Sequence, residues 1–242
     1  MGEILQRKAG QQKLLIIIPA YNEAENIERV VANLRENYPH WDYLVVNDGS
    51  KDDTAGICQR NGYPLLDLPV NLGLAGAFQA GIRYAYLNGY TMALQFDGDG
   101  QHEPCYIENM IDKMEQENLD IVIGSRFCEE KKPHTLRMLG STLITGAIRL
   151  TTGKRVADPT SGMRLFSANV LKNFSNNINY GPEPDTISYL LRCGASISEV
   201  QVEMHERIAG TSYLNLGRSV RYMLNMFISI LFVQFFRPRS AL

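Results

Sequence analysis

The stretch Thr91-Met-Ala-Leu-Gln-Phe-Asp-Gly-Asp-Gly-Gln-His102 is the most informative part of this chain. Residues 91–96 form a mostly apolar run, which predicts a buried strand. Asp97, Asp99 and Gln101 then follow at the carboxyl end of that strand. Two carboxylates two residues apart can share one hard cation, and the cation can in turn hold a diphosphate. A glycine-rich acidic turn without a metal is the ordinary alternative.

Length and composition fit one large domain, or one domain with appendages. The 242 residues are 45% hydrophobic, which is enough to bury a full core. The four cysteines lie far apart with no CxxC spacing, which predicts reduced thiols in a cytosolic setting and argues against a disulfide framework or a zinc site. Residues 1–13 are polar, and the apolar run at 14–18 is too short for a signal peptide or a membrane span.

Charge is unevenly distributed along the chain. Residues 1–130 carry 10 Lys or Arg against 20 Asp or Glu, a net of −10, whereas residues 131–242 carry 14 against 6, a net of +8. One interpretation is an acidic half that works near a cation and a basic half that works near an anion; the other is chance segregation of solvated charge. The basic residues are scattered singly with few aromatics between them, so we expect no nucleic-acid partner.

Short apolar runs alternate with helical patterns in the first half. We expect strands at 14–18, 43–46, 65–68, 91–96 and 120–123, and helices at about 22–37, 53–60, 74–88 and 105–116, the first capped by Asn22 with Glu25. This alternation predicts an α/β fold with a mainly parallel sheet and helices on both faces. Polar clusters follow the strands, at the sheet edge where ligands gather in such folds.

The second half is less regular. It predicts helices at 136–152 and 185–192, a strand at 196–202, and a loop over 158–166 that leads into a short strand.

Seven segments match a known family, in its order. They are Ile18-Pro-Ala-Tyr-Asn-Glu23, Val45-Val-Asn-Asp-Gly-Ser50, Asn71-Leu-Gly73, Asp97-Gly-Asp-Gly-Gln-His102, Gly124-Ser-Arg126, Asp158-Pro-Thr-Ser-Gly-Met-Arg164 and Glu206-Arg-Ile-Ala-Gly-Thr-Ser212. Together they resemble family 2 glycosyltransferases of the GT-A (Rossmann-like) fold. The last three resemble the polyprenyl-phosphate branch, which includes dolichol-phosphate mannose synthase. The resemblance covers about residues 14–213.

The resemblance implies a role for each matching residue on the donor side. Binding of the nucleotide-sugar falls to Pro19, Tyr21, Glu23, Val46, Asp48, Asn71, Gly73, Asp97, Gly98 and Asp99. Within this set, Val46 and Asp48 hold the base and ribose. Asp97 and Asp99, with Gln101 as a neutral third ligand, hold Mg²⁺ or Mn²⁺ against the diphosphate.

On the acceptor side, the resemblance places Arg126 and Arg207 at the diphosphate or the acceptor phosphate, for which a guanidinium is well suited. The family often has Lys where this chain has Tyr213. Asp185 matches an acidic residue that orients or deprotonates an acceptor hydroxyl. A helix N-cap after Pro184 is an equally good interpretation of Asp185.

The last segment, 214–242, is expected to be a helix appended to a catalytic domain of residues 1–213. Within that domain, we expect residues 14–130 to bind the nucleotide and the metal, and residues 131–213 to bind the acceptor. Residues 222–236 are almost continuously apolar, with a narrow polar stripe of Arg218, Arg221, Asn225 and Ser229. This pattern favours a helix lying in the membrane interface. The alternative is that the helix docks on this domain, on a second copy of the chain or on a small membrane partner. A helix that crosses the whole membrane is the least favoured interpretation.

The leading functional hypothesis is a metal-dependent inverting glycosyltransferase at the cytoplasmic face of the membrane. It would move one sugar from a UDP- or GDP-linked donor to polyprenyl phosphate. One alternative is transfer to a saccharide hydroxyl in polysaccharide synthesis, with Asp185 as the base. Another is a non-catalytic module that binds the nucleotide-sugar for a membrane partner. The sugar and the base stay open, because pocket selectivity depends on packing.

Overall fold

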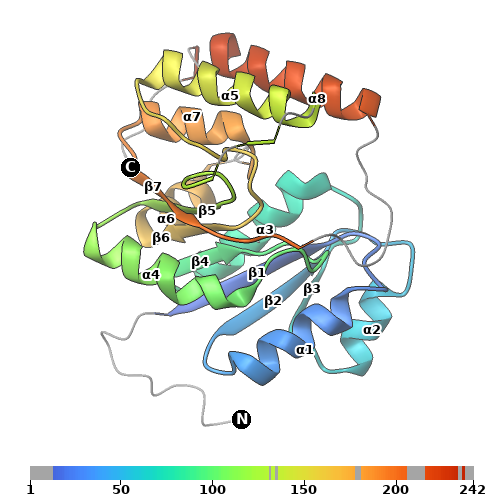
Figure 1. Cartoon of the computed structure of the whole chain (residues 1–242). Helices are drawn as coiled ribbons and strands as arrows, with labels where there is room; N and C mark the ends of the chain where they lie inside the picture. Colours follow the sequence, from blue (N-terminus) through green and yellow to red (C-terminus); the bar gives the residue numbers. More distant parts are fainter. Residues whose placement is uncertain are drawn as a thin grey trace.

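A computed structural model describes residues 13–130, 132–133, 136–177, 181–205, 216–233 and 236–237 (Figure 1). Within these ranges seven strands form one sheet. They are β1 (Leu14–Ala20), β2 (Asp42–Asn47), β3 (Leu65–Asp67), β4 (Met92–Gln95), β5 (Ile121–Ser125), β6 (Arg164–Ser167) and β7 (Ile197–Gln201). The strand order is β3-β2-β1-β4-β6-β5-β7. Only β6 runs antiparallel to its neighbours among these strands, so the sheet is mainly parallel, as the sequence predicts.

Helices cover both faces of the sheet. On one face lie α1 (Ile27–Asn37), α2 (Thr54–Arg60) and α4 (Ile107–Gln116), the last preceded by the 3₁₀ turn η1 (Pro104–Tyr106). On the other face lie α3 (Gly73–Leu87), α5 (Leu136–Thr152), α6 (Ala168–Asn176), α7 (Pro184–Arg192) and α8 (Leu216–Ile228), which continues into the π-helical turn η2 (Ser229–Val233). The α/β architecture with both faces covered is therefore confirmed (Figure 1).

Apolar periodicity explains why these elements form. In α1 the buried residues Ile27, Val30, Val31 and Leu34 recur at the spacing of one helix face. In β1, residues 14–18 are all buried, as expected for a central parallel strand covered on both sides. The resulting two apolar layers, one on each side of the sheet, fix the strand ends that carry the polar loops.

Two sequence expectations need correction. Asn22 does not cap the first helix: α1 begins at Ile27, and Asn22 has a positive φ of 56° with its side chain bonded to another loop. Helix α6 was not predicted. Its buried residues Val170, Leu171 and Phe174 follow a helical pattern, but the nine-residue segment offers only about two turns of signal.

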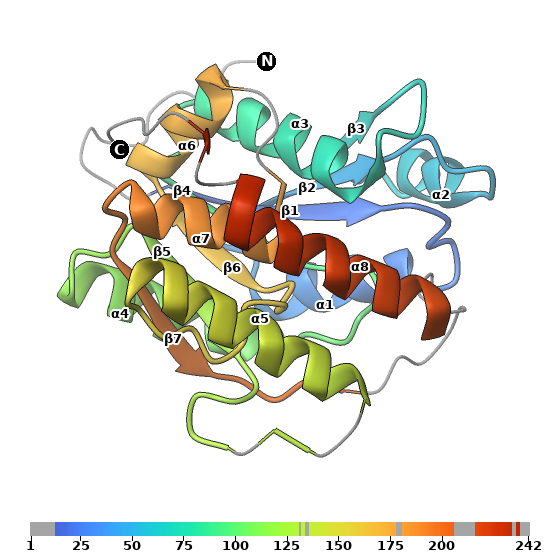
Figure 2. The same cartoon turned by 90° about the horizontal axis from the view of Figure 1, so that it is seen from above.

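The C-terminal helix packs on the domain itself. Met226 and Ile230 are buried in the same apolar layer as α3 and α5, and Gly140 of α5 admits the side chain of Met223. Figure 2 shows α5, α7 and α8 side by side over this face. Leu224, on the opposite side of α8, is exposed. Within the described ranges, no helix has the length and apolar character needed to cross a membrane.

Candidate active site

The loops that follow β1 and β2 are hydrogen-bonded to each other at the carboxyl edge of the sheet. The backbone N–H of Asn22 donates to Ser50 Oγ at 2.9 Å, and the N–H of Lys51 donates to Asn22 Oδ1 at 2.8 Å. One residue on, the N–H of Glu23 donates to Thr54 Oγ1 at 2.9 Å. The predicted meeting of these two polar clusters is therefore present.

Asp48 ties the loop after β2 to the loop that precedes α3. Asp48 is buried, with 3% of the residue exposed, and its Oδ1 accepts the backbone N–H of Leu72 at 2.7 Å. Asn71 Nδ2 donates to the backbone carbonyl of Asp48 at 3.1 Å. Gly49, at φ +62°, lies so close to the backbone of Val70 that a Cβ would meet it at 2.7 Å. The Asp48 carboxylate thus orders this edge of the site.

The remaining predicted donor residues flank these loops. Pro19 and Tyr21 are half-buried at the end of β1, and Gly73, at φ +75°, opens α3. Glu23 is also half-buried and accepts a hydrogen bond from Asn26 Nδ2 at 2.8 Å. Val46 is fully buried in the apolar layer under α3, so it can support a pocket only from beneath.

The acidic turn after β4 is the centre of the candidate site. The Asp97 side chain is 29% exposed; its Oδ1 accepts from Gln95 Nε2 at 3.3 Å, and its Oδ2 lies 3.7 Å from His102 Nε2. Asp99 is 8% exposed, and its Oδ1 accepts the N–H of Gln101 at 3.1 Å. Gly98 sits against the carbonyl of Pro19, where a Cβ would come within 3.1 Å.

The second half of the chain reaches this turn because β6 is antiparallel. The loop 158–163 that leads into β6 lies at the carboxyl end of its neighbours β4 and β5. A Cβ at Gly162 would lie only 1.9 Å from Asp97 Oδ2, so that loop is in direct contact with the acidic turn. The segment after β7 also arrives here, since Gln101 Nε2 donates to the His205 carbonyl at 3.0 Å and His102 bridges to Met204.

Arg126, directly after β5, forms a two-pronged ion pair with Asp158. Its Nε donates to Asp158 Oδ2 at 2.6 Å and its Nη2 to Oδ1 at 2.8 Å, and the Asp158 side chain is fully buried. Burial acts to raise the pKa of Asp158, but the hydrogen bonds and charge of Arg126 outweigh it and hold that pKa below its ordinary value. Glu199 accepts the backbone N–H of Asp158 at 2.8 Å. Arg126 therefore orders the loop 158–163.

Asp185 lies in the first turn of α7 and contacts the C-terminal segment. Ser229 Oγ donates to Asp185 Oδ2 at 2.7 Å, so Ser229 faces the protein rather than continuing an outward polar stripe. The N-cap position is occupied by Glu183, not Asp185. Burial, and then the charge of Asp185, raises the pKa of Glu183, with Arg164 acting in the opposite direction. Arg207, the other predicted phosphate-binding arginine, lies outside the described residues.

The predicted metal ligands suit a cation that is bound partly by the protein and partly by substrate phosphates. In the described part of the chain, no group of three His, Cys, Asp or Glu side chains could hold a metal by itself. The predicted ligands Asp97, Asp99 and Gln101 are two carboxylates and an amide. Mg²⁺ is commonly held by one or two carboxylates together with substrate phosphates, and Mn²⁺ also suits carboxylate and carbonyl oxygens. The residues present therefore fit such an ion.

Three residues next to Asp97 have no individual role in the sequence analysis, although two of them belong to the matching segment 158–164. Gln95 and Arg164 are paired across the β4–β6 ladder, and both are about 1% exposed. Gly162 is the third. A signal was available for the first two, because a polar residue inside an apolar strand marks a buried polar contact. Nothing in the sequence indicates that Gly162 meets Asp97, since 65 positions separate them.

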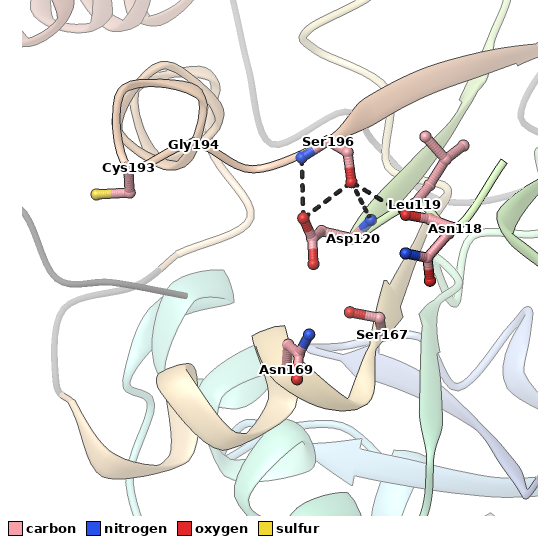
Figure 3. Close-up of a pocket in the computed structure, with 8 residues that line it drawn as sticks. All are labelled: Asn118, Leu119, Asp120, Ser167, Asn169, Cys193, Gly194 and Ser196. Carbon is pink, nitrogen blue, oxygen red and sulfur yellow. Dashed lines mark hydrogen bonds between the residues drawn. The ribbon is translucent and has the colours of Figure 1, made fainter.

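A hollow of about 430 Å³ is shown in Figure 3. Its lining residues lie where β5 and β7 begin and β6 ends, at the edge of the sheet opposite the candidate site. It is lined by residues that include Asn118, Asp120, Ser167, Asn169 and Ser196. Asp120 Oδ2 accepts from both the backbone N–H and the hydroxyl of Ser196 at 2.9 Å. These bonds join the starts of β5 and β7, so Asp120 and Ser196 have a structural role.

Comparison with known proteins places the chain in a family. The sequence model "Glycosyl transferase family 2" matches residues 15–174. An undecaprenyl-phosphate mannosyltransferase from Micrococcus luteus is 30% identical over 220 residues, 85% of this chain and 88% of the relative. A UDP-N-acetylglucosamine–dolichyl-phosphate N-acetylglucosaminyltransferase from Methanococcus voltae is 34% identical over 188 residues, 68% of this chain and 73% of the relative.

A solved structure supports the fold. The mannosyltransferase of Pyrobaculum calidifontis in complex with GDP-Man and Mn²⁺ superimposes with a TM-score of 0.65 at 17% identity, over 96% of this chain and 67% of that one. The expected GT-A-like architecture is thereby confirmed.

Proposed function

Since the chain belongs to glycosyl transferase family 2, we propose that it moves a single sugar from a nucleotide-sugar to polyprenyl phosphate, with a divalent cation, at the cytoplasmic face of a membrane. The observation that carries the proposal is the contact between Asp97 and Gly162. It joins the acidic turn after β4, which we assign to the donor, to the loop 158–163, which we assign to the acceptor. Relatives that are named for transfer to undecaprenyl and dolichyl phosphate support the choice of acceptor.

On the donor side, Asp48 and the loops around Tyr21, Glu23, Asn71 and Gly73 would hold the nucleotide. Asp97, Asp99 and Gln101 would hold Mg²⁺ or Mn²⁺. When bound, the cation would neutralise the charge that builds up on the departing diphosphate. Val46 would support the base from beneath, and Gly98 would let the turn lie close to β1. The base stays open, since one similar protein uses a UDP-sugar and another binds GDP-Man.

On the acceptor side, a phosphate oxygen of the lipid would attack the anomeric carbon from the face opposite the diphosphate. The bond from that carbon to the diphosphate would break, and its electron pair would leave with the nucleoside diphosphate. The product would be an inverted sugar–phosphate ester. The attacking phosphate is already anionic, so Asp185 would not need to act as a base; its bond to Ser229 suits a structural role. Arg126 and Arg207 would face the phosphates.

The outer surface of α5 and α8 would meet the membrane. Leu139 and Leu143 of α5 and Leu224, Ile228 and Phe232 on the C-terminal segment are each more than half exposed. Both helices lie side by side in one layer (Figure 2), and these exposed side chains would form a common outer surface. Exposed basic residues on the same elements suit anionic headgroups: Arg149 and Arg221.

The test is a transfer assay with the full chain, UDP- and GDP-sugars, and polyprenyl phosphate. We expect a sugar–phosphate lipid with one class of donor, loss of turnover in EDTA, and recovery on addition of Mn²⁺. Transfer only to added saccharide hydroxyls would show that the acceptor is a saccharide and not polyprenyl phosphate. Donor binding without any turnover would show that the chain is a binding module and not an enzyme. Undiminished turnover in EDTA would show that the reaction needs no divalent cation.

A further inference from the structure

Buried polar atoms without a hydrogen-bond partner gather around Asp97. Among the described residues they include Gln95 Oε1, both ring nitrogens of His102, and Arg164 Nε. Buried polar groups are nearly always hydrogen-bonded, and leaving one unpaired destabilises the fold. A cluster of them is therefore expected where a function requires it.

The geometry arranges these groups on two sides of one carboxylate. Gln95 Nε2 donates to Asp97 Oδ1 at 3.3 Å, and His102 Nε2 lies 3.7 Å from Oδ2, slightly beyond a hydrogen bond. The His102 side chain is 1% exposed, so it cannot turn to solvent. Arg164 lies opposite Gln95 in the β4–β6 ladder, and Asp97 is among the charges that act on its buried guanidinium.

We propose that Gln95 and His102 are positioning residues, which hold the Asp97 carboxylate in the orientation that binds a divalent cation together with the donor diphosphate. The inference rests on the proposed function, because it assigns residues to that same cation site. Neither side chain is expected to touch the sugar. Gln95 restrains Oδ1 through its amide, and His102, whose Nε2 lies 3.7 Å from Oδ2, would restrain the other oxygen.

The expected effect is on metal affinity. Groups that orient a metal ligand typically contribute 10–100-fold to metal binding. Removing either neighbour would let the partly exposed Asp97 carboxylate rotate away from the ion. Binding of the nucleotide without metal depends on other loops, among them the one around Asp48, and should be unaffected. A purely structural role would not separate these two affinities.

The experiment measures the free Mn²⁺ signal by electron paramagnetic resonance in titrations of the full chain with UDP or GDP, whichever the parent binds. Gln95→Leu and His102→Leu should bind Mn²⁺ about 10–100-fold more weakly than the parent. His102→Gln keeps a donor and should bind more tightly than His102→Leu. Ser167→Ala is the matched control, because Ser167 Oγ is also a buried atom without a partner but lies at the far end of β6.

Parent-like Mn²⁺ affinity in folded Gln95→Leu and His102→Leu would overturn the positioning role alone. A parent chain that binds the nucleotide but no Mn²⁺ would overturn the cation site of the proposed function as well. Equal losses of metal-free nucleotide affinity and Mn²⁺ affinity would also contradict the inference. If His102→Leu does not fold, Gln95→Leu and His102→Gln decide the question.

Discussion

Gly162→Ala is expected to remove most sugar transfer while leaving the fold intact. A Cβ at this position would lie 1.9 Å from Asp97 Oδ2 and 2.7 Å from Asp97 Cγ. Real Cβ contacts below 3.0 Å essentially do not occur, so the distance from residue 162 to the carboxylate must grow by at least 1.1 Å, and the side-chain carboxylate is the group expected to move. Gly162 is not among the glycines with positive φ, so the backbone itself accepts alanine.

A displacement of about 1 Å in a reacting group can cost about 100-fold in rate, which corresponds to roughly 2.7 kcal/mol of transition-state stabilisation. We therefore expect kcat/KM for the donor to fall about 100-fold at saturating Mn²⁺. The assay is transfer or donor hydrolysis, with thermal unfolding measured on the same samples. Gly146→Ala is the control: it lies within α5, and a Cβ there meets nothing within 4 Å.

Gly146→Ala should keep parent activity and gain about 0.4–1 kcal/mol of stability. Near-parental kcat/KM in folded Gly162→Ala would refute the reasoning, because Asp97 would then tolerate the displacement. A large fall in Tm would refute it in a different way, since the loss would then come from unfolding rather than from the carboxylate.

Three further predictions concern the second half of the chain. Arg126→Met should cost about 3–5 kcal/mol in urea unfolding at pH 7, because it leaves the buried Asp158 carboxylate unpaired. Because the pKa of Asp158 is lowered on folding, the pair stabilises the fold above pH 3.8, and this stabilisation is lost as the pH falls through the pKa of the folded state. The difference in unfolding free energy between parent and variant should therefore narrow in acid. A difference that does not change with pH would contradict this prediction. Asp185→Asn should reduce transfer to lipid phosphate only mildly, whereas near-complete loss would indicate a hydroxyl acceptor. Leu143→Glu with Leu224→Glu should weaken co-sedimentation with anionic vesicles, and unchanged binding would move the membrane contact elsewhere.

The first half of the fold could be predicted because each element carries its own signal. The buried run of β1 and the four apolar positions of α1 are local patterns, and strand–helix alternation implies a parallel sheet. The carboxyl edge follows from that topology, so the meeting of Asp48 with the Asn71 loop was predictable. The roles of these residues in binding the donor stay predictions.

The second half was less predictable, because its contacts are not local. Strand β6 has four residues, and its antiparallel direction depends on which neighbours it joins. The ion pair of Arg126 with Asp158 joins positions 32 residues apart. Both residues are visible in the sequence, but only the β5–β6 pairing shows that they meet. Likewise, the sequence predicts that Ser229 belongs to a polar surface stripe, and only the structure shows that its hydroxyl bonds to Asp185.

The direction of β6 gives the two halves of the site a common support. A loop that precedes an antiparallel strand lies at the same edge as the loops that follow its parallel neighbours. Asp97 follows β4, Arg126 follows β5, and Gly162 precedes β6, so the side chains assigned to donor and acceptor depend on one set of strand registers. In that register Gln95 and Arg164 are paired, and both are buried beside Asp97. A shift of β6 by one residue would turn Arg164 to the other face of the sheet and separate Gly162 from Asp97. In the proposed site, the positions of both substrates would therefore depend on the β4–β6 register in which Gln95 and Arg164 are paired.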